Sequence, residues 1–139
     1  MKANELMIGD WVRIAPYDII DQVDCLLTEY AVTSHGDTCG QYEYKDIEPI
    51  LLTQEVLEKN GFVCVEVGDN GIGTPAKFRN RFEKWECRTQ WHTFHVFYDR
   101  IRHSFSLNAA YSNHIEGMKY VHELQHALRI SGIDKEVEL

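Results

Sequence analysis

The fold is decided by residues 82–107, which read FEKWECRTQWHTFHVFYDRIRHSFSL. Apolar or aromatic side chains recur at every second position over most of this run. Because successive side chains of a strand point to opposite faces, this period indicates antiparallel strands with one buried face. We therefore predict an antiparallel β-meander over residues 62–107, with a turn at Asp69-Asn70-Gly71. Ile101 and His103 share the parity of its buried face, so His103 is expected to be a hydrogen-bonded core residue.

A C-terminal helix is predicted from about Ile115 to Ser131. Apolar side chains recur there at helical spacing, and Gly132 is a residue type that commonly ends helices. The stripe consists of Ile115, Met118, Val121, Leu124, Gln125 and Leu128. If this stripe packs onto the meander, the result is an α+β layer arrangement.

The first part of the chain predicts a small β unit of SH3-like size. Several short extended runs within residues 6–50 are broken by Gly and Asp, which is typical of tight turns between strands. A short helix should follow, because Thr53 is a good N-cap and Gly61 suits the left-handed position after the last turn. We expect residues 1–50 to form the β unit and residues 51–139 to form the helix, sheet and final helix, together as one compact unit.

Composition and charge limit the classes of function. The chain has 139 residues and a net charge of −8, which disfavours non-specific DNA binding by the whole surface. No apolar leader and no run long enough to cross a bilayer is present, so we predict a cytoplasmic protein without a membrane partner. The four cysteines form no C-x-x-C pair and are expected to be buried as small hydrophobes.

One motif suggests metal chemistry. Residues 122–126 read HELQH and match H-E-x-x-H. Histidines at i and i+4 lie one helical turn apart, so His122 and His126 could chelate zinc and Glu123 could act as general base. This reading predicts a zinc-dependent hydrolase.

The surroundings of the motif argue against that reading. A catalytic zinc needs a third protein ligand, and the metzincin continuation is absent because Arg129 stands where its glycine should be. The remaining donors are His114, Glu136, Glu138, or a strand bearing His92 and His95. A helical wheel places the two motif histidines about 120° from the apolar stripe. We therefore favour two solvent-facing histidines, with no metal and no cofactor.

A basic and aromatic stretch suggests nucleic-acid or other anion binding. Residues 77–103 hold seven Lys or Arg and three acids, a local charge of +4. A sheet that exposes aromatic rings among cations can stack bases and hold phosphates. The candidate contacts are Arg79, Arg81, Lys84, Arg88, Trp85 and Trp91. The alternative is a core face of rings with a solvated outer face of cations.

Three segments carry a resemblance to a known group of proteins. They are residues 7–12 (MIGDWV), 47–62 (IEPILLTQEVLEKNGF) and 119–126 (KYVHELQH). They resemble a family of small uncharacterised proteins from prophage and mobile-element regions of gut anaerobic bacteria, whose patterns are I-x-P-I-P-L-T-E-E and Y-V-H-Q-L-Q-N. The sequence departs from them at Leu51, where the family has proline, and at Glu123 and His126, where it has Gln and Asn.

The resemblance implies a mobile-element origin and an accessory role, and it brings no known activity or cofactor. It also implies that the H-E-x-x-H match arises from two substitutions in a structural helix. We therefore expect a non-catalytic accessory or binding protein with a protein or nucleic-acid partner. Its binding surface is expected in grooves between the β unit and the sheet. Nucleic-acid binding through residues 77–103 and zinc hydrolysis are the alternatives.

Overall fold

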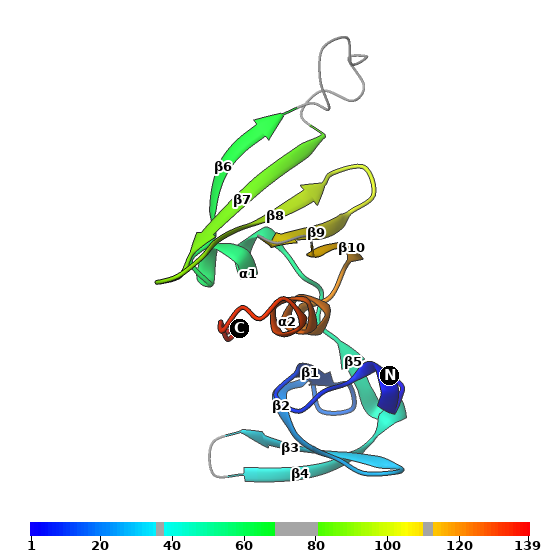
Figure 1. The fold of residues 1–139 in the computed structure, drawn as a ribbon. Helices are drawn as coiled ribbons and strands as arrows, with labels where there is room; N and C mark the ends of the chain where they lie inside the picture. Colours follow the sequence, from blue (N-terminus) through cyan, green and yellow to red (C-terminus); the bar gives the residue numbers. More distant parts are fainter. Residues whose placement is uncertain (36–37, 69–80, 110–112) are drawn as a thin grey trace. The chain divides into compact units, whose positions relative to one another are not determined.

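The computed structural model describes residues 1–35, 38–68, 81–109 and 113–139 (Figure 1). The chain divides into two units, each with a five-stranded antiparallel sheet. The first unit is Met1–Leu51 with Tyr120–His126, and the second is Leu52–Lys119 with Ala127–Leu139. Antiparallel sheets combined with helices confirm the predicted α+β class.

The first unit is a meander whose strand order is β4-β3-β2-β1-β5. Its elements are η1 (Ala3–Glu5), β1 (Trp11–Ile14), β2 (Ile19–Leu26), β3 (Tyr30–His35), β4 (Thr38–Glu43), η2 (Tyr44–Asp46) and β5 (Ile47–Pro49). Strand β1 pairs with both β2 and β5, which places Ile14 opposite Ile19 and Ile47. In the described residues β4 and β5 do not pair with each other, so the sheet is open and an SH3-like barrel stays a prediction.

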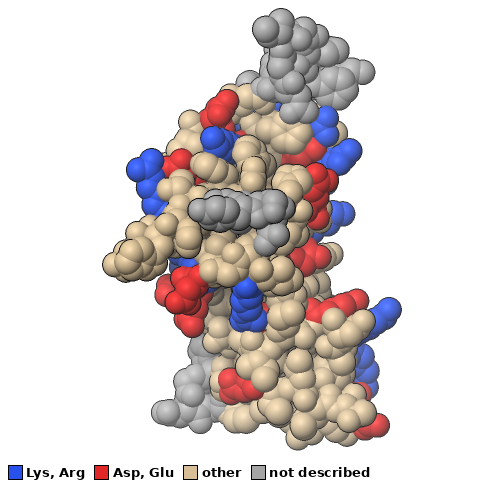
Figure 2. All heavy atoms as spheres, viewed as in Figure 1, with Lys and Arg blue, Asp and Glu red and all other residues tan. Residues whose placement is uncertain are grey.

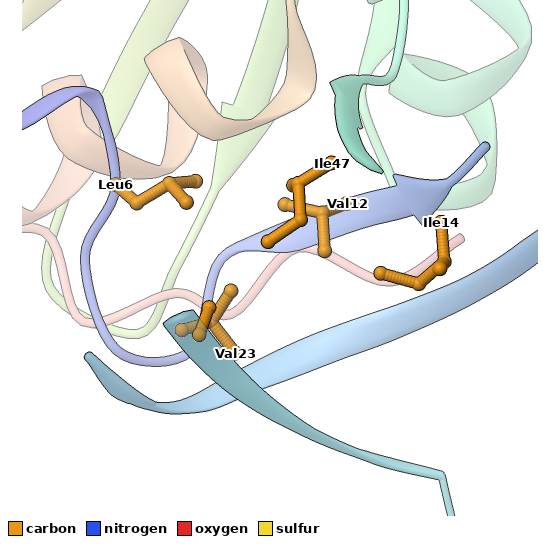
Figure 3. Packing of buried hydrophobic residues seen from close by; sticks show 6 residues of the cluster. Leu6, Val12, Ile14, Val23 and Ile47 are labelled. Carbon is orange, nitrogen blue, oxygen red and sulfur yellow. The ribbon is translucent and has the colours of Figure 1, made fainter. Parts of the chain in front are cut away.

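A small apolar cluster holds the first unit together (Figure 3). Strand alternation produces it: Val12 and Ile14 point inward from β1, while Arg13 between them is exposed. Val23 of β2 and Ile47 of β5 complete the same layer, and each of these side chains is buried. Leu6 and Ala31 are also members. The cluster fixes the segment that leads into β1.

The second unit contains the predicted meander. Its elements are α1 (Gln54–Lys59), β6 (Val63–Gly68), β7 (Phe82–Arg88), β8 (Thr93–Asp99), β9 (Ser104–Ala109) and β10 (Asn113–Met118). Each strand pairs antiparallel with the next, in the order β10-β9-β8-β7-β6. The predicted turn at 69–71 lies outside the described residues. The sequence-based helix α1 is confirmed, since Thr53 Oγ1 accepts the Val56 N–H at 3.3 Å and Gly61 has φ +75°.

The period-two pattern identifies the buried face of this sheet with one error. Trp85, Phe94, Val96, Phe105 and Leu107 are buried as their parity predicts. Placing Ile101 and His103 in the core was wrong, because both are exposed in the turn between β8 and β9. The Asp99 carboxylate accepts the Ile101 and Arg102 N–H groups and so forms this turn.

Helix α2 runs from Val121 to Ile130, and the predicted start at Ile115 was wrong. Residues 113–118 pair with β9, and Gly117 has φ +82°, a left-handed conformation that no α-helix contains. The later part of the predicted stripe is confirmed: Val121, Leu124, Gln125 and Leu128 are all buried.

The cysteine prediction holds only in part. Cys87 is buried and Cys25 is half-buried, whereas Cys39 and Cys64 are exposed, and all four are free thiols. Burial raises the pKa of the Cys87 thiol, which keeps it protonated and unreactive. No helix in the described ranges is both long and apolar enough to cross a bilayer.

Asn60 holds the C-terminal segment in place. Its Nδ2 donates to the carbonyls of Val56 and Glu138 at 2.8 and 2.7 Å, and its Oδ1 accepts the Glu138 N–H at 2.8 Å. Ile133 and Val137 of the same segment are buried. Because Asn60 is itself buried, its amide has little access to water that could replace these bonds.

We expect Asn60→Ala to lower the free energy of unfolding by about 1–3 kcal/mol, since it leaves buried backbone groups unpaired. Amide hydrogen exchange should accelerate at Glu138. The exposed Asn4 provides the control, and Asn4→Ala should alter neither quantity. Unchanged exchange at Glu138 in Asn60→Ala would contradict this account of the C-terminal segment.

Candidate functional site

The two histidines of the H-E-x-x-H motif do not face solvent, and that prediction was wrong. His122 is only 6% exposed, and His126 Nε2 lies 2.7 Å from Asp10 Oδ2. The Asp10 carboxylate is fully buried. The cause lies in tertiary structure: Asp10 is 116 residues away in the sequence, so a helical wheel cannot reveal it.

The segment before β1 is tied to the first half of α2 by several polar contacts within the first unit. Asp10 Oδ2 also accepts the Met7 N–H at 2.7 Å. The Gln125 side chain accepts the Trp11 N–H at 3.1 Å through Oε1 and donates to the Gly9 carbonyl at 2.9 Å through Nε2. Buried polar groups are stable only when they are hydrogen-bonded, and these bonds satisfy several of them at once.

Glu123 begins the helix. Its Oε2 accepts the backbone N–H of Tyr120 at 3.0 Å, and Tyr120 directly precedes the first helical residue. This bond is half of a capping box, in which a carboxylate at the third helical position binds the N-cap amide. A negative charge there also favours the positive end of the helix dipole. The glutamate of the motif therefore has a structural task in this fold.

His122 lies in a tight aromatic setting. Its ring stacks on Tyr120 at 5.8 Å between centroids and meets the His126 ring edge-on at 5.6 Å. Its Nδ1 atom is buried without a hydrogen-bond partner in the described part of the chain. Burial lowers the pKa of His122 below its ordinary value of 6.5, against the opposing effect of Asp10 and Glu123.

Two of the other histidines considered as zinc ligands are bonded to acids on their own or a neighbouring strand. His114 Nε2 lies 2.7 Å from Glu116, and His95 Nε2 lies 3.1 Å from Glu86. His92 is exposed near the tip of the β7–β8 hairpin. In the residues that the structure describes, no three His, Cys, Asp or Glu side chains gather closely enough to hold a metal ion.

The aromatic candidates of the basic stretch separate into two environments. Trp85 is buried in the sheet core and donates its indole N–H to Glu83 at 3.0 Å, so its proposed stacking role was wrong. Trp85 points to the same face as Cys87, two residues later on β7, and Cys87 is opposite the buried Phe94 on β8; this is the core face. Trp91 is 78% exposed at the hairpin tip and is free to contact a partner.

Most of the described cations of this stretch are paired with its own acids. Arg81 binds Asp99 at 2.6 Å, Arg100 binds Glu83 at 2.6 Å and Arg88 binds Glu86 at 2.7 Å. The guanidinium of Arg81 lowers the pKa of Asp99 to about 2. Lys84 has no ion pair among the described residues, and Arg79 lies outside them. Among the described residues, the cations of this stretch are therefore largely offset by acids beside them, and blue and red atoms lie near one another in the view of Figure 2.

The open face of the second sheet is hollowed into a groove. It has a volume of about 710 Å³ and contains cations, carboxylates, rings and hydroxyls. Its lining residues include Glu66, Lys84, Phe97, Asp99, Ser104, Ser106, Asn108 and His114. Among the sequence-based candidates, Arg81 and Lys84 are in this lining. On β7, β8 and β9 the lining side chains have the parity opposite to that of the buried apolar side chains.

Sequence reasoning missed most of this groove. The polar ladder Ser104, Ser106 and Asn108 on β9 alternates with the buried Phe105 and Leu107. That alternation was visible in the sequence and could have identified the ladder as the outer face. Asp10 and Gln125 carried no comparable signal, because their partners are distant in the chain.

We expect His126→Ala to lower the free energy of unfolding by about 1–3 kcal/mol, because the buried Asp10 carboxylate loses a hydrogen-bond partner. His92→Ala removes the same atoms at an exposed position and should change the free energy of unfolding by less than about 0.5 kcal/mol. Urea unfolding at pH 7 provides both values. Equal effects of the two substitutions would contradict a structural role for His126.

Stability should fall as the pH drops below the ordinary His value of 6.5, partly because of His122. Since its pKa is lower in the folded than in the unfolded chain, the unfolded chain binds more protons in that range. The groups that act on it are Asp10, Glu123, His126 and Glu5. Urea unfolding should show that the free energy of unfolding decreases less between pH 7 and pH 5 for His122→Phe than for the native chain. The same loss in both proteins would contradict burial of a neutral imidazole.

Comparisons with protein-family models, with curated proteins and with solved structures found no match for the chain.

Proposed function

We propose that this chain is a non-catalytic binding protein whose binding surface is the groove on the open face of the β6–β10 sheet. The observation that carries the proposal is the groove itself, about 710 Å³ lined by side chains of both charges with two aromatic rings. A hollow that combines an apolar surface with several polar groups is the usual form of a binding site. This proposed surface lies within one sheet. It differs from the sequence-based prediction, which expected the binding surface in grooves between the β unit and the sheet.

The non-catalytic part of the proposal rests on how the motif residues are used. His126 binds Asp10, Glu123 caps the helix and His122 packs on Tyr120. A metalloprotease needs both imidazoles for the metal and the carboxylate for water. Zinc hydrolysis stays the alternative, and metal analysis of the purified protein tests it: one zinc per chain would favour it.

The charge of the groove favours a partner of mixed charge over a polyanion. Among its described lining residues, the cations Arg81, Lys84 and Arg102 are balanced by the carboxylates of Glu66, Asp99 and Glu116. A site for nucleic acid normally carries a clear excess of positive charge, because phosphates supply most of the binding free energy. A protein partner fits this balance better.

Nucleic-acid binding stays the second candidate, because Lys84 has no ion pair in the described residues and Trp91 is largely exposed. A gel shift at low salt discriminates between the two. Phosphate-driven binding should appear there and fade as salt is added.

The biological setting forms part of the same proposal. The segments 7–12, 47–62 and 119–126 support an accessory role in a prophage or mobile element, and a cytoplasmic location is consistent with that role. An SH3-like first unit is supported by the strand order β4-β3-β2-β1-β5 and by the short η2 helix between β4 and β5.

A groove-filling substitution tests the binding surface. Peptides selected on the native protein from a displayed library of random 16-residue sequences should bind Ser106→Trp at least about tenfold more weakly, since the indole occupies the groove. Thr93→Trp places the same ring at an exposed position at the start of β8 and should bind them as the native protein does. Affinities are measured by surface plasmon resonance, with circular dichroism as a check that each variant is folded.

Two outcomes would contradict the proposal: a library that yields no binding peptides, or peptides that bind the native protein and both variants equally.

A further inference from the structure

One row of side chains crosses the groove on four neighbouring strands. Glu66 of β6 is opposite Lys84 of β7, Lys84 is opposite Phe97 of β8, and Phe97 is opposite Ser106 of β9. All four line the groove. The row therefore presents a carboxylate, an ammonium group, an aromatic ring and a hydroxyl in that order.

The first two groups of the row are not engaged with each other. Opposite charges that face each other across a strand pair commonly interact. Glu66 and Lys84 are directly opposite, yet no ion pair or side-chain hydrogen bond joins either of them to another described residue. By contrast, Arg81, Arg100 and Arg88 elsewhere in this sheet are all paired. Glu66 and Lys84 can thus each accept a charged group from a partner.

The spacing of the row indicates the shape of that partner. Neighbouring strands lie about 4.8 Å apart, so the row offers one group about every 4.8 Å. Side chains three or four residues apart on a helix are about 5–6 Å apart. Alternate side chains of an extended chain are about 7 Å apart, which fits the row less well.

Resting on the function proposed above, we infer that the groove binds an amphipathic helical segment of a protein. The segment carries a basic side chain opposite Glu66, an acidic one three or four residues later opposite Lys84, and an apolar one a further turn along on Phe97. Strand addition at the edge strand β6 is a poorer mode, because β6 contains a register shift between Cys64 and Glu66 that interrupts regular pairing.

Charge reversal tests the identity of the partner. Peptides from the random 16-residue library that bind the native protein but are rejected by Ser106→Trp are sequenced and measured. They should share a Lys or Arg and an Asp or Glu three or four residues apart, followed by an apolar residue. Glu66→Lys and Lys84→Glu should each weaken their binding about tenfold or more, because like charges then face each other.

A swap and a control complete the design. A selected peptide whose basic and acidic residues are exchanged should bind the double variant Glu66→Lys/Lys84→Glu better than it binds the native protein. Glu29→Lys makes the same change in net charge as Glu66→Lys, at an exposed residue of the first unit, and should leave peptide binding unchanged.

The outcomes separate this inference from the broader proposal. Peptides that need an open groove but lack the charge pattern, and that tolerate both reversals, would overturn the inference and leave the binding surface standing. Binding of a 20-nucleotide oligo-dT probe at low salt that is lost in Lys84→Glu would reassign the groove to nucleic acid. Peptides indifferent to Ser106→Trp would remove both proposals.

Discussion

A buried carboxylate without hydrogen-bond donors would destabilise any fold, and the first unit is organised around one. Asp10 is fully buried and receives the Met7 N–H and the His126 ring nitrogen. Gln125, one residue before His126, binds the backbone on both sides of Asp10. The bonds of Gln125 and His126 connect residues far apart in the chain, so the first half of the last helix and the segment around Asp10 hold each other in place.

This constraint decides which parts of the molecule are available for function. The residues that most resemble a catalytic motif are used as a helix cap, a carboxylate partner and a packed ring. In the second unit, large side chains fill the buried face of the sheet, and the groove that we propose as the binding surface lies on the opposite face. On that face Arg81 is held by Asp99, and the charges of Glu66 and Lys84 stay available.

Local patterns predicted what local forces determine. The Thr53 cap, the Gly61 stop and the alternation around Phe94 gave α1 and the meander correctly, because hydrogen bonds and strand parity act within a few residues. The predicted start of α2 was wrong, because residues 113–118 pair with β9 despite the helical spacing of Ile115 and Met118. The motif histidines and the cations were misjudged for a related reason: their partners are distant in sequence or on neighbouring strands, where no single-chain pattern records them.

A double-mutant cycle on Asp10 and His126 tests the central claim most directly. The free energy of unfolding is measured at pH 7 for the native chain, Asp10→Asn, His126→Gln and the double variant. If the two side chains support each other as described, the losses of unfolding free energy in the two single variants should together exceed the loss in the double variant by about 1 kcal/mol or more. Additive effects, within about 0.3 kcal/mol, would show that the pair does not hold the helix to the first strand.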